Sequence, residues 1–288
     1  MRFKGSLFAA AMALASTSAF AEAPLALSVY NADADSFHVN SVLVSGEQEA
    51  LLIDTGFTRA DALRIAAEVL DSGKTLTTIY ISQADPDFYF GTELLGELFP
   101  EARLVAAPAV RERILANREA KLAYWGPRLG DNAPQATRLP EPLAGDTLSV
   151  EGRVLEVRGL DGELAHRPYV WVPSLEAIVG TIAVFGDLHV WTADTQQAGE
   201  RQAWLAQLDE MEALAPAVVV PGHMQAGTPL TAENIAYTRD YLLAYERAAA
   251  EAEDSQALID AMRAAYPEAG LEIALQIGAA VTLGEMEW

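Results

Sequence analysis

Three apolar strands that run straight into polar residues constrain the fold and function of this chain more than any other feature. Each strand is followed by side chains that can bind a ligand: residues 49–53 by Asp54, residues 78–82 by Gln83, Asp85 and Asp87, and residues 217–220 by His223. In α/β proteins, ligands collect where strands stop and loops begin. The sequence therefore predicts a site at these strand ends.

Strands and helices alternate along the chain, and hairpins occur in both halves. Strands are predicted at residues 25–30, 41–44, 49–53, 78–82, 103–106, 147–150, 154–157, 169–172, 177–179, 182–185 and 217–220. Helices are predicted at residues 59–71 (capped by Thr58), 91–98, 108–124 and 197–214, and through most of the chain after Thr231. Gly, Pro and Asn predict a long surface loop over 125–142, of a kind that often acts as a lid. This order favours a mixed α/β sandwich without a break between two domains.

The N-terminus has the pattern of an export signal. Arg2 and Lys4 precede an apolar run at residues 7–15, and Ala19-Phe20-Ala21 has the small-x-small pattern that signal peptidase accepts. We predict a signal peptide over 1–21 and a single domain over 22–288, located in the periplasm or secreted. No later segment offers about 18 uninterrupted apolar residues, so we expect no stable membrane insertion.

The composition narrows the classes of partner. The chain contains no cysteine, which excludes disulfides, a thiolate nucleophile and Cys metal ligands. Its formal net charge is −22, and a surface this acidic repels nucleic acid and anionic lipid. We therefore expect a small-molecule substrate or ligand and no nucleic-acid partner, while the oligomeric state stays open.

The segments LLIDTG, ISQADPDFYFG and VVVPGH, in this order and spacing, resemble the metallo-β-lactamase superfamily over nearly the whole predicted mature chain. The segments VWVPSLEAIVG and HVWTADT are similar to an exported branch of that superfamily. The resemblance implies an α/β fold, an αββα sandwich of two mixed β-sheets flanked by helices. It also implies one or two metal ions, usually zinc, and hydrolysis of esters, amides, thioesters or phosphoesters.

The metal-binding motif of that family, Thr-His-x-His-x-Asp-His-x-x-Gly, is largely altered in this chain. Gln83 and Asp85 stand at the first two His positions, and Phe88, which cannot bind a metal, stands at the third. Asp87 matches the family's Asp and is the one ligand of the motif that is retained. Zinc prefers imidazole and thiolate to carboxylate, so the remaining oxygen-rich set is closer to what Mn²⁺, Mg²⁺ or Ca²⁺ accept.

Other site residues are implied by the same resemblance. His223 matches the family's late His, and His166 lies roughly at the place of its middle His. Thr181 stands where the family has an Asp that bridges two metals, so we expect this bridge to be missing. Asp54 is expected to support the metal loop from behind, and the residues alone assign no role to His189.

Three functions remain open at this point. The first is an exported hydrolase that holds at most one divalent metal through Asp85, Asp87, His166 and His223, with metal-bound water attacking a small ester, amide or phosphoester. The metal would be zinc by resemblance, or Mn, Mg or Ca by ligand chemistry. The second is a non-catalytic descendant that binds no metal and uses the cleft for a small molecule or a partner. The third is metal-independent acid–base catalysis by an Asp–His pair, Asp87 and His223. The resemblance favours an enzyme, whereas the replaced histidines favour a pseudo-enzyme.

Overall fold

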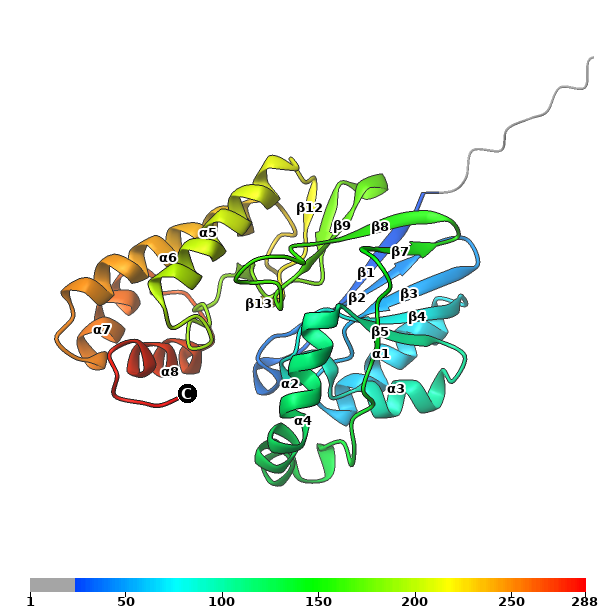
Figure 1. Ribbon diagram of the computed structural model, residues 1–288, viewed down its shortest axis with the longest axis horizontal. Coiled ribbons are helices and arrows are strands. Elements are labelled where there is room, and N and C mark those ends of the chain that lie inside the picture. The colour runs from blue at the N-terminus through cyan, green and yellow to red at the C-terminus, as the bar shows by residue number, and fades with distance from the viewer. Residues whose placement is uncertain (1–23) are drawn as a thin grey trace, which may run out of the picture.

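The computed structural model describes residues 24–288. It consists of two mixed β-sheets that pack face to face, with helices on their outer sides (Figure 1). The first sheet has the strand order β1-β2-β3-β4-β5-β6, and the second has the order β12-β10-β9-β8-β7. A third, two-stranded sheet joins β11 to β13. The predicted αββα sandwich is confirmed, and the predicted signal peptide lies outside the described residues.

The first sheet brings two of the predicted strand ends together. It consists of β1 (Ala26–Asn31), β2 (Asn40–Ser45), β3 (Glu49–Ile53), β4 (Thr75–Ile81), β5 (Arg103–Ala106) and β6 (Glu141–Pro142). Strands β3 and β4 are parallel, and their register pairs Ile53 with Tyr80. The residues that follow the two strands, Asp54 and Ser82, therefore emerge at the same edge.

Helices of the N-terminal half lie on the outer face of this sheet and in the loops that follow its strands. They are η1 (Ala34–Ser36), α1 (Arg59–Asp71), α2 (Pro86–Tyr89), α3 (Thr92–Leu98), α4 (Pro108–Leu129) and η2 (Gly130–Asn132). Thr58 caps α1 as predicted, and it does so in a reciprocal capping box with Asp61. The cap fixes the chain direction just after the first strand end.

Helix α4 corrects the predicted surface loop over 125–142. The helix continues to Leu129, five residues past its predicted end, although it contains Pro127. Trp125 packs edge-on against Phe57, with 5.2 Å between ring centroids, so tertiary packing outweighs the local helix-breaking residues. The rest of the segment contains η2 and, at its end, strand β6, rather than forming one continuous loop.

The second sheet carries the third strand end. Its strands are β7 (Thr147–Val150), β8 (Arg153–Arg158), β9 (Tyr169–Val172), β10 (Ala177–Val179) and β12 (Val218–Val219), with η3 (Pro173–Leu175) between β9 and β10. The predicted strand over 182–185 is wrong, because only Phe185–Gly186 (β11) is extended and pairs with His223–Met224 (β13). The Thr181 hydroxyl accepts a hydrogen bond from the amide of Ala183 and bends the chain there.

The C-terminal half contributes four helices on the outer side of the second sheet, α5 before β12 and the other three after β13. They are α5 (Ala198–Ala213), α6 (Glu233–Glu251), α7 (Ser255–Ala265) and α8 (Glu272–Thr282). Trp204 of α5 and Tyr241 of α6 are fully buried in the core shared with this sheet. Helices α7 and α8 extend beyond the sheet toward the side of the molecule that carries α4 (Figure 1). In residues 24–288, no helix is both long enough and apolar enough to cross a membrane.

Candidate active site

Asp54 ties the first strand end to the second. Its carboxylate accepts hydrogen bonds from the Ser82 backbone amide at 2.7 Å and from the Ser82 hydroxyl at 2.6 Å. Its φ of 65° lies in the left-handed region, which Asp adopts more readily than most residues. Burial raises the pKa of Asp54 to about 7, although both hydrogen bonds from Ser82 act in the opposite direction. This contact sets where the motif loop begins.

Two glycines allow the loops of the site to approach each other closely. A Cβ on Gly91 would lie 2.0 Å from the carbonyl oxygen of Thr55, and one on Gly222 would lie 2.1 Å from that of Thr181. Any side chain at either position would force the loops apart. The Gly of the DPDFYFG segment and that of Pro-Gly-His are therefore required by backbone packing.

Asp87 and His223 meet at the floor of a cleft. The imidazole Nε2 of His223 lies 3.6 Å from the Oδ2 of Asp87, and both side chains are largely buried. The Nδ1 of His223 is 2.9 Å from the carbonyl oxygen of Phe37. Because a carbonyl can only accept, Nδ1 carries the hydrogen, and in the neutral ring Nε2 is left as the base.

Burial shifts both members of this pair toward their uncharged forms. It raises the pKa of the Asp87 carboxyl well above its usual range, with a further contribution from nearby Asp85. It also lowers the pKa of His223 to about 4. The pair therefore favours a neutral carboxyl group facing a neutral imidazole, an arrangement that can donate one proton and accept another.

Two phenylalanines hold the His223 ring. Phe185 stacks on it with 5.2 Å between ring centroids, and Phe88 meets it edge-on at 5.4 Å. Phe88 is fully buried at the third His position of the family motif. An apolar ring thus occupies the place from which a third ligand would reach a metal beside Asp87 and His223.

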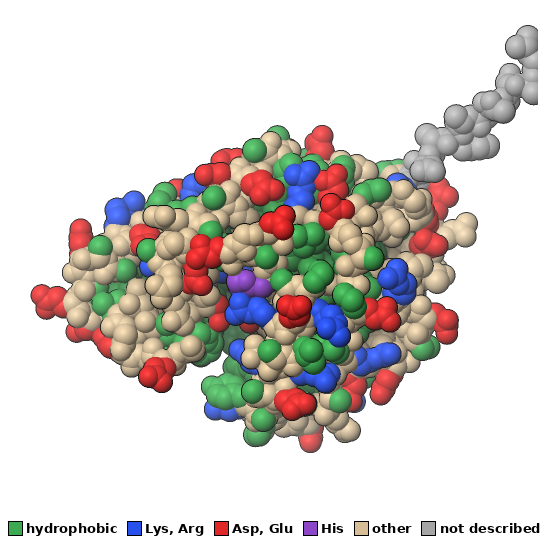
Figure 2. Space-filling model, in the orientation of Figure 1, with side chains coloured by type: hydrophobic (Ala, Val, Ile, Leu, Met, Phe, Trp, Pro, Cys, Tyr) green, Lys and Arg blue, Asp and Glu red, His purple; other side chains and the backbone are tan. Residues whose placement is uncertain are grey.

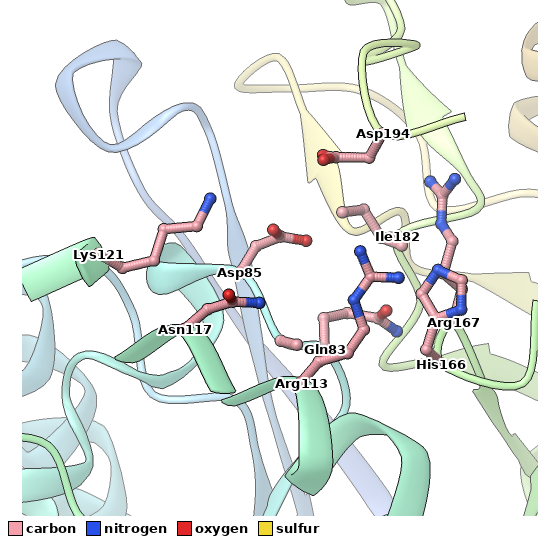
Figure 3. A pocket seen from close by; sticks show the side chains of 10 residues that line it. Gln83, Asp85, Arg113, Asn117, Lys121, His166, Arg167, Ile182 and Asp194 are labelled. Carbon is pink, nitrogen blue, oxygen red and sulfur yellow. The ribbon is translucent and has the colours of Figure 1, made fainter. Parts of the chain in front are cut away.

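The other predicted ligands line a small recess at the inner end of the cleft. Asp85 and His166 face it together with Gln83, whose amide donates a hydrogen bond to the Pro168 carbonyl at 2.9 Å (Figure 3). Burial raises the pKa of Asp85 to about 6, with nearby Asp194 adding to the shift. Burial lowers the pKa of His166 to about 4.

These donors do not fit a resident zinc ion. Asp87 and His223 supply two ligands, whereas catalytic zinc takes three from the protein and structural zinc takes four. At the recess, the cationic side chains of Arg113, Lys121 and Arg167 would repel a metal ion. In the described part of the chain, no three or more His, Cys, Asp or Glu side chains form a group that could hold a metal. Of the four predicted ligands, Asp87 and His223 thus lie at the cleft, His166 lies in the recess, and Asp85 lines both.

The cleft above the Asp87–His223 pair has a volume of about 700 Å³, large enough for a small organic molecule. It lies between α4 and the chain around α8, where the surface is hollowed (Figure 2). Seven aromatic side chains line it: Phe37, Phe57, Tyr124, Trp125, Phe185, Trp191 and Trp288. The cleft can therefore take a ligand with an apolar body and bring its polar end to the buried pair.

Several residues of the cleft were not found by sequence reasoning. Arg113, Asn117 and Lys121 line it from one face of α4, and their spacing of four residues was a usable signal. Arg167 and Trp288 carry no comparable pattern. Conversely, His189 bonds to the Tyr241 hydroxyl at 3.0 Å and does not line the cleft.

Comparison with known proteins agrees with this fold. Two solved structures are similar to it: a metallo-β-lactamase from Pontibacter korlensis (20% identity, 76% of this chain and 94% of that chain, TM-score 0.54) and a metallo-β-lactamase family protein from Thermus thermophilus (18% identity, 91% and 93%, TM-score 0.63). No curated protein matches the sequence. The profile of the metallo-β-lactamase superfamily matches residues 34–223. The chain therefore belongs to the metallo-β-lactamase superfamily.

Proposed function

We propose that this protein hydrolyses a small ester, amide or phosphoester with Asp87 and His223 as its acid–base pair. The observation that supports the proposal is the approach of the two side chains, 3.6 Å apart at the floor of a cleft of about 700 Å³. Members of the superfamily are generally hydrolases, and the resemblance matches Asp87 and His223 to two of the family's metal ligands. In this chain the proton transfers would be carried by side chains alone.

The roles of the two groups follow from their protonation. The neutral His223 accepts a proton from water at Nε2, while the Phe37 carbonyl keeps the ring oriented through Nδ1. The water oxygen attacks the carbonyl or phosphoryl centre, and the Asp87 carboxyl gives its proton to the leaving group. The imidazolium then returns a proton to Asp87, which restores the starting state of both groups.

The proposal is tested by hydrolysis of chromogenic p-nitrophenyl esters, p-nitrophenyl phosphates and p-nitroanilides. We expect Asp87→Asn and His223→Gln each to lower turnover about 100-fold or more, which is the usual contribution of a positioned acid or base. His189→Gln is the matched control, because His189 is also buried but lies outside the cleft. Turnover that survives in both Asp87→Asn and His223→Gln would refute the proposal.

A second candidate is a non-catalytic protein that binds a small molecule in the same cleft. It is favoured by the packing around His223, which Phe88 and Phe185 leave only 5% exposed, so that little room remains for an attacking water. Calorimetric titration separates the two candidates. Saturable binding of a substrate analogue by a protein without turnover on any of the three chromogenic classes would support this candidate.

We also propose that the protein acts outside the cytoplasm, on the basis of its N-terminal sequence pattern. Expression of the full chain in a bacterial host, followed by fractionation and N-terminal sequencing, tests this. We expect the mature chain in the periplasm or the medium to begin at Glu22. An unprocessed chain that stays in the cytoplasm would contradict it.

A further inference from the structure

Positive charge gathers at the inner end of the cleft, in a chain whose net charge is −22. Arg113 and Lys121 reach the recess from α4, and Arg167 reaches it from the segment before β9 (Figure 3). The carboxylates of Asp85 and Asp194 face the same space. Three cations thus outnumber two carboxylates, and the low pKa of His166 leaves that ring uncharged near neutral pH.

Arg167 is the most unusual of these cations. Its side chain is only 4% exposed, and its guanidinium lies over the indole of Trp204 at 4.1 Å from the ring centroid. Its Nε and Nη1 have no hydrogen-bond partner among the described residues. A buried guanidinium with unused donors is costly, and an anion that accepted its hydrogen bonds would remove that cost.

The neighbouring charges are not consumed by contacts with one another. In residues 24–288, neither Arg113 nor Lys121 forms an ion pair with Asp85 or Asp194 within 4.0 Å. Asp194 instead accepts hydrogen bonds from the indole nitrogens of Trp191 at 2.7 Å and Trp288 at 2.8 Å. The cations of the recess are therefore available to a ligand.

The size of the recess suits one small charged group. Its volume is about 50 Å³, whereas one water needs roughly 10–15 Å³ on the same measure, so the recess can hold one carboxylate or phosphate group. Asp85, Arg113 and Lys121 line both the recess and the wider cleft, so the two spaces are continuous. A ligand anchored in the recess would extend between the aromatic side chains of the cleft.

We infer that the recess binds an oxyanion, carboxylate or phosphate, of a ligand with an aromatic or apolar body. Arg113 and Arg167, assisted by Lys121, supply the positive charge that a metal ion supplies in other members of the superfamily. The inference rests on the proposed function for the location of the ligand, and it narrows the substrate class to anionic molecules. Guanidinium groups suit this role because their planar donors match the geometry of carboxylate and phosphate.

The inference is tested by calorimetric titration of the purified protein with four probes: benzoate, phenyl phosphate, benzyl alcohol and inorganic phosphate. We expect the two aromatic anions to bind about tenfold or more tightly than benzyl alcohol. Inorganic phosphate should compete with both anions. Benzyl alcohol binding as tightly as the anions would overturn the inference.

Substitutions at the recess sharpen the test. Arg113→Gln should weaken binding of both aromatic anions about tenfold and leave benzyl alcohol within about twofold. Arg113 is exposed on α4, so this variant tests charge with little risk to folding, and Arg167→Gln gives the parallel test for the buried cation. Arg103→Gln is the matched control, because Arg103 is exposed on β5 and does not line the cleft. Anion affinity that is unchanged in Arg113→Gln would refute the inference.

The test of anion binding in the recess can fail or succeed independently of the test of the Asp87–His223 pair. Anion binding that depends on Arg113, in a protein whose Asp87→Asn variant keeps full turnover, would support the recess and refute the acid–base pair. Loss of turnover in Asp87→Asn, with anion affinity independent of Arg113, would refute the recess and support the pair.

Discussion

Asp54 and Asp87 are two buried carboxyl groups on neighbouring loops, and they differ in what surrounds them. Asp54 is 2% exposed and accepts two hydrogen bonds from Ser82. Asp87 is 7% exposed, and its side chain hydrogen-bonds no other described residue and faces His223 across 3.6 Å. Burial raises the pKa of both groups. The Asp54 carboxylate is therefore bonded by another strand end, whereas the Asp87 carboxyl is bonded only by its own backbone amide.

This difference separates scaffold from site. A buried carboxyl that joins two segments through hydrogen bonds stabilises the fold, whereas one that bonds no other residue and faces a cleft is a candidate for function. The frame of the family motif survives at Asp54, Ser82 and Gly91, where it serves backbone packing. At two of the expected ligand positions, Gln83 hydrogen-bonds the Pro168 carbonyl and Phe88 packs against the His223 ring.

The largest expected effect is at Asp87. Asp87→Asn should lower turnover by about 100- to 10,000-fold, or roughly 3–5 kcal/mol of activation free energy. It should change the free energy of unfolding by less than about 1 kcal/mol, because the side chain hydrogen-bonds no other described residue and Asn keeps an acceptor for its own backbone amide. Steady-state kinetics and urea unfolding of the same preparation measure both. An Asp87→Asn variant that loses stability but keeps turnover would show that Asp87 supports the fold and not catalysis.

The second largest effect is at Asp54, where we expect a loss of stability rather than a loss of turnover. Asp54→Ala should lower the free energy of unfolding by about 3 kcal/mol, because it leaves the Ser82 amide and hydroxyl buried without an acceptor. Asp54→Asn keeps an acceptor and tolerates the positive φ, so its loss should be smaller. Urea unfolding at fixed pH compares the two. Equal free energies of unfolding for Asp54→Ala and the wild type would show that Asp54 does not stabilise the fold.

Phe88 tests whether the metal-binding frame is intact. Phe88→His should place a third ligand beside Asp87 and His223, so that zinc at 100 times its Kd stabilises the variant by about 2.7 kcal/mol. The same zinc concentration should leave the thermal midpoint of the wild type unchanged, and Phe88→Asn controls for the buried polar group. Equal stabilisation of the wild type by zinc would contradict the two-ligand geometry.

The smallest effect comes from a third carboxylate that has hydrogen bonds without deep burial. Glu151 accepts hydrogen bonds from the amides of Glu47, Gln48 and Glu49, which lower its pKa to about 2, with that of Gln48 contributing most. Because its pKa falls on folding, its stabilisation is present above about pH 4.5 and is lost as the pH falls toward 2. Acid unfolding of Glu151→Gln should therefore show a shallower loss of stability over this range than the wild type. Identical pH profiles would refute it.

Most of the fold could be predicted from the sequence, because local sequence patterns and tertiary structure agree. The bounds of the strand over 49–53 and of the helix over 59–71 follow from apolar runs that end at Asp54 and from the Thr58 cap. The end of α4 could not be read, because Trp125 gains its contacts from Phe37 and Phe57, far away in the sequence. The predicted strand over 182–185 is wrong, because an apolar run alone does not distinguish a strand from a buried bend.

The candidate site could be predicted only in part, because some of its residues are brought together by tertiary packing alone. Asp87 and His223 follow predicted strands, and parallel pairing of β11 with β13 supports the placement of His223. Arg167 and the face of α4 that carries Arg113 and Lys121 reach the cleft through the packing of separate elements, which no local pattern specifies. The sequence also could not show that Gln83 is committed to the Pro168 carbonyl.

If Asp87 and His223 act without a metal ion, as proposed, turnover does not depend on bound metal. Metal content and turnover are determined on one preparation before and after exhaustive chelation. We expect turnover to stay within about twofold after chelation and to depend on His223 in both states. Turnover that is lost on chelation and restored by Zn²⁺ or Mn²⁺ would show that the reaction needs a metal ion.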